Sequence, residues 1–320
     1  MPDISICIVN WNVEKLLEAC LDSIYKNTKD IEFEIIVVDN NSSDSSVKMV
    51  KERFPQVTLI ENKINAGFTK ANNQAIRVSK GKYIMLLNPD SEIKNNALFT
   101  MVKFMEKHGE CAALGCKLLN TDGTLQRSCK TFPTLEVLFY NALFLDQIFP
   151  KSKIFGKHFM TWWDFNDTRE VDQPMGSALM IKRSVLDKVG NFDENIFIWF
   201  DEVDLCYRIK KAGWKIFFTP EAEIVHHLSK SFKQWTSLPQ ILKGTYLWRK
   251  ARNYYFRKHY GIFSAWLLWV YDLLQVLLIV GILFLVYKIL TPFFSAFGGK
   301  FIPLSMKWRG VPSKARRGEE

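Results

Sequence analysis

The 320-residue sequence has no glycine-rich phosphate-binding motif, neither GxGxxG after its first apolar run nor GxxxxGK[ST] anywhere. A nucleotide bound by this chain must therefore have its phosphate charge neutralised in another way. Cysteine is scarce, with six residues and no CxxC pair, which excludes a disulfide-stapled scaffold and favours buried thiols in a reducing cytosol. With 24% charged residues, the chain is too polar for a polytopic membrane protein.

Positive charge is concentrated near the C-terminus. From His226 onward the chain has 15 Lys and Arg and three acidic residues, leaving 28 basic and 30 acidic residues before that point. A tail this basic attracts an anionic partner. Its basic residues flank an apolar segment and form no platform of interleaved aromatics. We therefore expect a membrane surface as partner, and no nucleic acid.

The apolar segment covers residues 261–290 and is long enough to cross about 30 Å of hydrocarbon. Asp272 lies a third of the way along it, and a carboxylate at mid-bilayer costs roughly 2.5–3.5 kcal/mol. Because basic clusters lie on both sides, the sequence favours a re-entrant or in-plane hairpin with its bend at Thr291 and Pro292. A single spanning helix and a buried core helix are the alternatives.

The first 120 residues alternate short apolar runs with segments whose apolar residues recur at helical spacing. The runs predict strands and the spaced segments predict helices. Predicted strands cover 4–9, 33–38, 57–60 and 83–87, and predicted helices cover 15–25, 45–54 and 68–78. This alternation is typical of a doubly wound α/β fold with a mostly parallel central sheet.

Polar side chains follow three of these strands. Asn10 follows the first, Asp39 the second, and Asn88 and Asp90 the fourth. Turn formation and helix capping explain the polar residues after any one of these strands. Ligands of such sheets bind beyond the carboxyl ends of the strands, so polar residues after three strands together predict a site there. Asp90 would hold Mg²⁺ or Mn²⁺ together with phosphate oxygens.

A second acidic cluster lies further along the chain. Asp201, Glu202 and Asp204 occupy the first turn of a predicted helix, where the helix dipole favours carboxylates whatever their role. Asp201 and Asp204 share a helix face and Glu202 points about 100° away, so the three are not expected to serve one site equally. His226, after a strand predicted at 216–218, is a candidate metal ligand with Asp90.

Residues 134–149, TLEVLFYNALFLDQIF, are apolar on most sides and lie between the two clusters. The segment is either part of the core or part of an acceptor groove that admits a lipid-linked sugar.

As a set, these motifs resemble the family two glycosyltransferases of GT-A fold, most closely their rhamnosyltransferase-like branch. The resemblance covers roughly residues 4–260 and rests on IVNWN, VVDNNSSD, NAGFTKANNQAI, LLNPDS, GSALMIKRSVLDKVGNFDE, FIWFDEVDLCYRIKKAGW and HHLSKS. It implies that Asp39 binds the base or ribose of a nucleotide diphosphate sugar, with Asn10 and Asn65 nearby.

The resemblance also assigns the metal and the base. Asp90 matches the last residue of the family's DxD metal motif, in which Asn88 replaces the first acid, and His226 matches a position that contacts metal or diphosphate. The second acid of the family's ED pair is the general base. That position is Glu202 here, because the order is Asp201-Glu202, and Asp201 is the alternative base.

The implied enzyme is an inverting, metal-dependent glycosyltransferase that moves a rhamnose-like deoxyhexose or a hexose to a lipid-linked or oligosaccharide acceptor. The QxxRW motif of processive synthases is missing, which implies single additions. The chain would work in cell-surface polysaccharide synthesis at the cytoplasmic face of the membrane, anchored by its C-terminal hydrophobic segment. A non-catalytic, membrane-bound sugar- or nucleotide-binding module on the same fold is the alternative.

The expected domain organisation has three parts. Residues 1–230 form the GT-A catalytic domain, divided into a nucleotide-sugar-binding half (1–120) and an acceptor and catalytic half (121–230). Residues 231–260 form a basic helical extension, and residues 261–320 form the hydrophobic membrane-associating segment with its basic tail.

Overall fold

The computed structural model describes residues 1–227 and 237–296. Met1–Trp266 form one compact unit, and Leu267 begins a second one. The basic tail expected beyond residue 296 and the end of the HHLSKS motif lie outside the described residues. The three-part division of the chain stays a prediction.

The described strands are β1 (Ile4–Asn10), β2 (Phe33–Asp39), β3 (Thr58–Glu61), β4 (Tyr83–Leu87), β5 (Ser91–Ile93), β6 (Cys111–Leu119), β7 (Leu125–Gln126), β8 (Cys129–Lys130), β9 (Arg169–Glu170), β10 (Gln173–Pro174), β11 (Ala178–Lys182) and β12 (Lys215–His226). The described helices are α1 (Glu14–Asn27), α2 (Ser46–Arg53), α3 (Phe68–Val78), α4 (Ala97–Lys107), α5 (Leu135–Ala142), α6 (Leu145–Ile148), α7 (Arg183–Val189), α8 (Asp201–Lys211), α9 (Leu238–Tyr260) and α10 (Ile262–Ala296).

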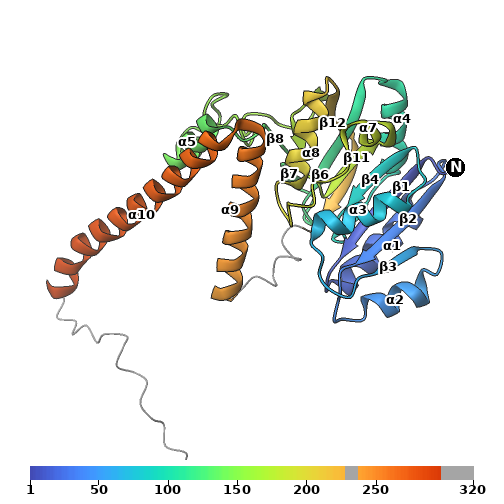
Figure 1. The fold of residues 1–320 in the computed structure, drawn as a ribbon, viewed down its shortest axis with the longest axis horizontal. Coiled ribbons are helices and arrows are strands. Elements are labelled where there is room, and N and C mark those ends of the chain that lie inside the picture. Colours follow the sequence, from blue (N-terminus) through green and yellow to red (C-terminus); the bar gives the residue numbers. More distant parts are fainter. Residues whose placement is uncertain (228–236, 297–320) are drawn as a thin grey trace, which may run out of the picture. The chain divides into compact units, whose positions relative to one another are not determined.

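Among the described residues, ten strands form one sheet, with the main path β3-β2-β1-β4-β11-β6-β12-β5. The first four strands of this path are mutually parallel, as the βα alternation predicts. β11 then runs antiparallel to both β4 and β6, and β12 is parallel to β6. The predicted α/β fold with a mostly parallel central sheet is confirmed, and helices cover both faces of the sheet (Figure 1).

The two faces of the sheet bury two separate apolar clusters. Ile4, Ile6 and Ile8 of β1 point into the cluster that includes side chains of α1, α2 and α4. Cys7 and Val9, one residue out of phase, point into the cluster that includes α3, α7 and α8. A strand covered on both faces must be apolar throughout, which explains the continuous runs in the sequence.

The described strand β12 is longer than the segment predicted at 216–218. It runs from Lys215 to His226 and changes register between Thr219 and Glu223, where Pro220 interrupts the ladder. A bulge of this kind tolerates proline and bends the strand. Because β12 continues past the bulge, His226 lies opposite Ser91 of β5.

The hairpin predicted at the C-terminus is wrong. α10 is one helix of 35 residues that continues through Thr291 and Pro292. Within it, Ile262–Lys288 is long and apolar enough to cross a membrane, with mean hydropathy 2.3, and the most apolar window is not buried in the protein. That window is therefore not the core helix considered as an alternative. Length and composition alone make it a candidate span.

Candidate active site

Asn10 and Asp39 face each other at the carboxyl ends of β1 and β2. The parallel register places the two residues opposite one another, and the Asn10 Nδ2 donates to Asp39 Oδ2 at 2.8 Å. The backbone N–H of Ser42 donates to the other carboxylate oxygen, also at 2.8 Å. Both side chains are buried, so the carboxylate is held rigidly at the sheet edge. The Asn10 Oδ1 is buried and makes no hydrogen bond among the described residues.

Asn65 lies next to this pair, in the turn before α3. Its Oδ1 accepts hydrogen bonds from Asn40 Nδ2 at 3.1 Å and from the Gly67 N–H at 3.0 Å. Gly67 has φ +88°, and a Cβ there would lie 2.5 Å from the Phe197 ring. Only glycine fits such a backbone at so close an approach. The turn is thereby packed against the segment that leads into α8.

Asp90 and His226 form the second pair of the site. The pairing of β5 with β12 places His226 opposite Ser91, one residue after Asp90. The His226 Nε2 lies 3.3 Å from Asp90 Oδ1 and 3.4 Å from Asn88 Nδ2, and Asp90 and His226 are buried. The sequence therefore identified three residues that the fold does bring together.

Gln126 sets the tautomer of His226. The Gln126 Nε2 donates to Asn120 Oδ1 at 2.9 Å and to the His226 carbonyl at 3.2 Å, which turns Gln126 Oε1 toward His226 Nδ1 at 2.7 Å. The hydrogen therefore sits on Nδ1, and in the neutral ring the Nε2 lone pair faces the Asp90 carboxylate. Two acceptors this close need a proton or a cation between them.

This arrangement fits a divalent cation. Ligands of an octahedral Mg²⁺ at about 2.1 Å lie about 3 Å from one another, which matches the separation of Asp90 Oδ1 and His226 Nε2. A metal-binding histidine commonly donates its other nitrogen to a fixed acceptor, as His226 does to Gln126. In the part of the chain that the structure describes, no group of three or more His, Cys, Asp or Glu side chains could hold a metal. The remaining ligands would come from phosphate oxygens.

The acid pair lies at the start of α8, on a strained turn. Trp199 and Phe200, the two residues before the helix, both have positive φ, of 60° and 58°. Such backbone in large residues costs about 1–3 kcal/mol each and persists where the surrounding packing imposes it. Phe200 is buried, with its ring 5.6 Å from that of Tyr255 in α9. This packing sets where Asp201 and Glu202 project.

Asp201 and Glu202 interact with each other despite pointing in different directions along the helix. Burial raises the pKa of Asp201 well above its usual range, and the neighbouring Glu202 charge raises it further. Burial also raises the pKa of Glu202, but the positive charge of Lys130 and a hydrogen bond from Asp201 oppose that rise. Burial therefore favours the protonated form of both carboxyls.

Glu202 lines a small cavity of about 20 Å³ together with Ser128, Lys130, Gln173, Pro174 and Met175. This volume lies below the range of whole-ligand sites, about 300–1,000 Å³, so the cavity is a recess beside the carboxylate. The segment Gly176–Ser177 joins the recess to the metal side. A Cβ at Gly176 would lie 3.4 Å from Glu202 Cβ, and the Ser177 carbonyl accepts from the Asn88 N–H at 2.9 Å.

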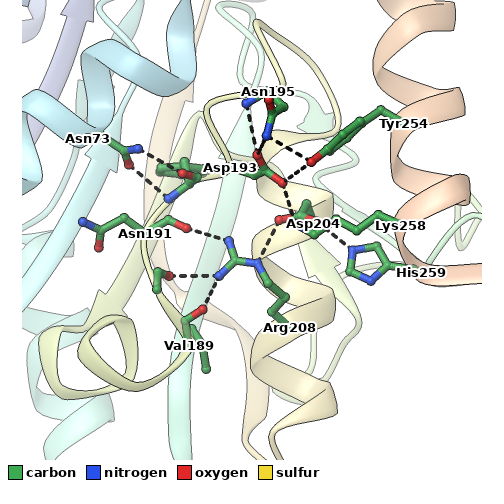
Figure 2. Close-up of polar contacts among 12 residues, drawn as sticks. Asn73, Val189, Asn191, Asp193, Asn195, Asp204, Arg208, Tyr254, Lys258 and His259 are labelled. Carbon is green, nitrogen blue, oxygen red and sulfur yellow. Dashed lines mark hydrogen bonds and ion pairs between the residues drawn. The ribbon is translucent and has the colours of Figure 1, made fainter.

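Asp204 does not belong to the acid pair. Its fully buried carboxylate accepts from Arg208 at 2.8 Å and from Lys258 and His259 of α9 at 2.7 Å each. Burial alone would raise the pKa of Asp204, but these three donors outweigh it and hold the pKa below its usual value. Figure 2 shows Lys258 and His259 reaching α8 from the neighbouring helix. The sequence-based expectation that the three acids differ in role agrees with this placement.

The same cluster fixes the loop between α7 and α8. Arg208 donates to the carbonyls of Val189 and Asn191 at 2.6 and 2.7 Å, and Lys258 also contacts Asp193 at 2.7 Å (Figure 2). We call Asp193, Asp204, Arg208, Lys258 and His259 the α8–α9 clasp. It holds the start of α8, and with it the acid pair, against α9.

Sequence reasoning missed Gln126, Lys130 and the members of the clasp in α9. Gln126 lies 100 residues from its partner His226 and carries no motif. Lys130 shares a recess with Glu202 only because β8 pairs with β10. The sequence predicts Lys258 only as part of the basic residues that flank the apolar segment. No local pattern distinguishes a lysine that binds a buried aspartate from one that faces solvent.

Comparison with known proteins shows the family. The family model described as "Glycosyl transferase family 2" matches residues 5–189. The chain is 26% identical over 208 residues to "N-acetylglucosaminyl-diphospho-decaprenol L-rhamnosyltransferase" of Mycobacterium tuberculosis (strain H37Rv), covering 62% of this chain and 67% of that protein. It is 28% identical over 241 residues to "Rhamnosyltransferase WbbL" of Escherichia coli (strain K12), covering 71% and 85%.

A solved structure supports the fold. GalNAc-T7, crystallised with UDP, GalNAc and Mn²⁺, superposes with a TM-score of 0.52 at 17% identity. The match covers 71% of this chain and 44% of that one, so the chain spans less than half of its length.

The fold and the family match define an α/β enzyme of GT-A type. The chain belongs to glycosyl transferase family 2 and is similar to rhamnosyltransferases, as its motifs predict. It is a glycosyltransferase.

Proposed function

We propose that the protein is an inverting, non-processive glycosyltransferase of cell-surface polysaccharide synthesis. It transfers a rhamnose-like deoxyhexose or a hexose from a nucleotide diphosphate donor to a hydroxyl of a lipid-linked glycan. It uses Mg²⁺ or Mn²⁺ and works at the cytoplasmic face of the membrane, associated through α10.

One observation carries the proposal. The Glu202 carboxylate borders a recess joined by Gly176–Ser177 to the residues beside Asp90 and His226. A group that accepts a proton and a group that neutralises a diphosphate are the two requirements of sugar transfer. Their connection through Gly176–Ser177 supports an enzyme over a non-catalytic binding module.

Glu202 is the general base in this proposal. The acceptor hydroxyl enters the recess and gives its proton to the Glu202 carboxylate as its oxygen attacks the anomeric carbon. Asp201 keeps its proton, and its hydrogen bond holds the Glu202 carboxylate in place. Attack occurs on the face opposite the diphosphate, so the configuration at the anomeric carbon inverts.

Asp39, Asn10 and Asn65 bind the donor in this proposal. The Asp39 carboxylate is fixed by Asn10 and by the Ser42 N–H, and accepts hydrogen bonds from the ribose or base. Asp90 and His226 hold the cation, and Asn88 lies next to them. When bound, the divalent ion supplies positive charge that stabilises the departing diphosphate.

The lipid-linked acceptor rests on two supports. The mycobacterial relative is named for a diphospho-decaprenol substrate, and this chain carries a candidate membrane helix, Ile262–Lys288. Both are consistent with an acceptor held at a bilayer. The rhamnose-like donor rests on the similarity to two rhamnosyltransferases.

A donor screen tests the proposal. The full chain is mixed with Mn²⁺ and a panel of dTDP-, UDP- and GDP-sugars, and thermal midpoints are measured, since a bound donor raises the midpoint. The stabilising donor is then supplied with extracted membrane lipids, and transfer and hydrolysis of labelled sugar are followed. Transfer with inverted configuration supports the proposal. Donor binding without transfer or hydrolysis indicates the non-catalytic module.

A further inference from the structure

The segment around α5 and α6 exposes apolar side chains at unusual density. Phe139, Leu143, Phe144, Ile148, Phe149 and Ile154 are all exposed, at 44% or more of their surface. These six lie within 16 residues, whereas the whole of residues 1–138 exposes four large apolar side chains. Scattered exposed apolar residues are ordinary, but a contiguous group of them marks an interaction site. Their exposure contradicts the core alternative from the sequence, whereas the acceptor groove stays a prediction.

We propose that this group, here called the α5–α6 surface, inserts into the headgroup region of an anionic membrane. Two features of the surface favour lipid. Lys151 and Lys153 are exposed beside it, while the acidic Glu136 of α5 is neutralised by Lys157 at 2.9 Å. Aromatic and aliphatic side chains bordered by lysines are the composition of interfacial membrane segments.

The position of Tyr260, just before α10, also favours a membrane as the partner of the α5–α6 surface. The Tyr260 hydroxyl donates to the carbonyl of Pro133 at 3.4 Å, and α5 begins two residues after Pro133. Tyr260 is the last residue of α9, and Ile262 begins the candidate membrane helix. If Ile262 lies near a bilayer, the start of α5 lies near it too. The inference therefore rests on the proposed membrane association of α10.

Such a contact has a consequence for the acceptor. Lys130, which borders the recess of Glu202, lies five residues before α5. A lipid-linked sugar enters from the bilayer, so seating α5 in the headgroups brings the recess close to the depth where the sugar and its diphosphate reside. The surface would thus act in acceptor delivery, beyond anchoring.

Site-specific fluorescence on the full chain tests the inference. The six native cysteines are buried, and burial raises the pKa of Cys7 and Cys116 to about 12, so a single introduced cysteine is labelled selectively. An environment-sensitive dye is attached in separate variants at Ile148→Cys, at Leu278→Cys in α10, and at Lys48→Cys in α2 as the exposed control. Vesicles of phosphatidylcholine with phosphatidylglycerol are compared with pure phosphatidylcholine.

The expected result is a several-fold rise and blue shift at position 148 in the anionic vesicles, with quenching by brominated lipid, and no change at position 48. Lys151→Glu with Lys153→Glu should lose most of the signal at position 148. A water-exposed label at 148 beside an inserted label at 278 overturns the inference and leaves the membrane role of α10 intact. Exposed labels at both positions overturn both.

Two further outcomes also overturn the inference. A shift at position 148 without vesicles that grows with protein concentration identifies a second copy of the chain as the occupant. An equal signal after both lysines are reversed contradicts an anionic surface.

Discussion

The imidazole of His259 lies 2.7 Å from the carboxylate of Asp204, which joins the last turn of α9 to the first turn of α8. Asp204 is three residues after Asp201, and the clasp around it fixes the part of α8 that carries the acid pair. The geometry of the proposed catalytic pair therefore depends on a helix that follows the whole α/β sheet in sequence.

The clasp should contribute to stability in a pH-dependent way. The pKa of Asp204 is lower in the folded than in the unfolded state, so its contribution is complete above about pH 4 and is lost as the pH falls further. Asp204→Asn should lower the free energy of unfolding by about 3 kcal/mol at neutral pH. The variant should also lose less stability than the wild type between neutral and acid pH.

Thermal unfolding across this pH range measures both effects. Asp187→Asn, at an exposed position of α7, is the matched control and should leave the midpoint unchanged. Equal acid sensitivity in Asp204→Asn and the wild type would contradict the assigned role of Asp204.

Glu202→Gln should abolish proton abstraction. We expect kcat to fall about 10²–10⁴-fold, the range that general base catalysis supplies, while donor binding is retained. Because the pKa of Glu202 is raised, wild-type activity should decline on acidification at a pH above that of an ordinary glutamate, about 4.3. Glu221→Gln, exposed in β12, is the control. Full activity in Glu202→Gln would move the base to Asp201 or elsewhere.

Asp201→Asn separates the roles of the pair. If Asp201 is protonated in the active enzyme, asparagine keeps its hydrogen-bond donor, and activity should fall far less than in Glu202→Gln. A folded-state pKa raised above the unfolded value means that ionised Asp201 costs stability as the pH rises. The variant should therefore have a higher melting temperature than the wild type at pH 8. A lower midpoint together with lost activity would argue against this protonation state.

Gln126→Ala should weaken the cation site without removing a ligand. Loss of the acceptor for His226 Nδ1 frees the tautomer and the ring orientation, and changes of this kind typically cost about 10–100-fold in metal affinity. Mn²⁺ binding in the presence of nucleoside diphosphate, followed by electron paramagnetic resonance, measures the loss. Gln56→Ala, at an exposed position, serves as the control.

Replacing Asp90, the proposed metal ligand, should have a stronger effect than Gln126→Ala. Asp90→Ala should abolish Mn²⁺ binding and activity together, and EDTA should inactivate the wild type. Unchanged activity in EDTA would refute the metal requirement.

Deletion of residues 267–320 leaves the compact unit Met1–Trp266 whole and removes most of α10. The truncated protein should leave the membrane pellet, completely so after a high-salt wash, because any remaining contact through the α5–α6 surface is peripheral and screened by salt. Cell fractionation with immunodetection measures the distribution. Equal pelleting of the truncated and full chains after the wash would contradict anchoring by α10.

The sequence by itself determined the α/β fold and the sheet edge at which polar residues collect. Runs such as that of residues 6–9 are apolar throughout because both faces of the sheet are covered, and this pattern is local. Parallel strands then place residues that follow them, such as Asn10 and Asp39, side by side.

Only the tertiary structure decided how the side chains pair and where the apolar surface faces. Residues distant in sequence form the Gln126–His226 contact and the α8–α9 clasp. The exposure of the α5–α6 surface depends on which face of the segment the rest of the protein leaves uncovered. The continuation of α10 through Pro292 is also a result of the tertiary structure alone. Such contacts result from packing of whole elements, and hydrophobic periodicity records whether a residue is buried but not which residue it touches.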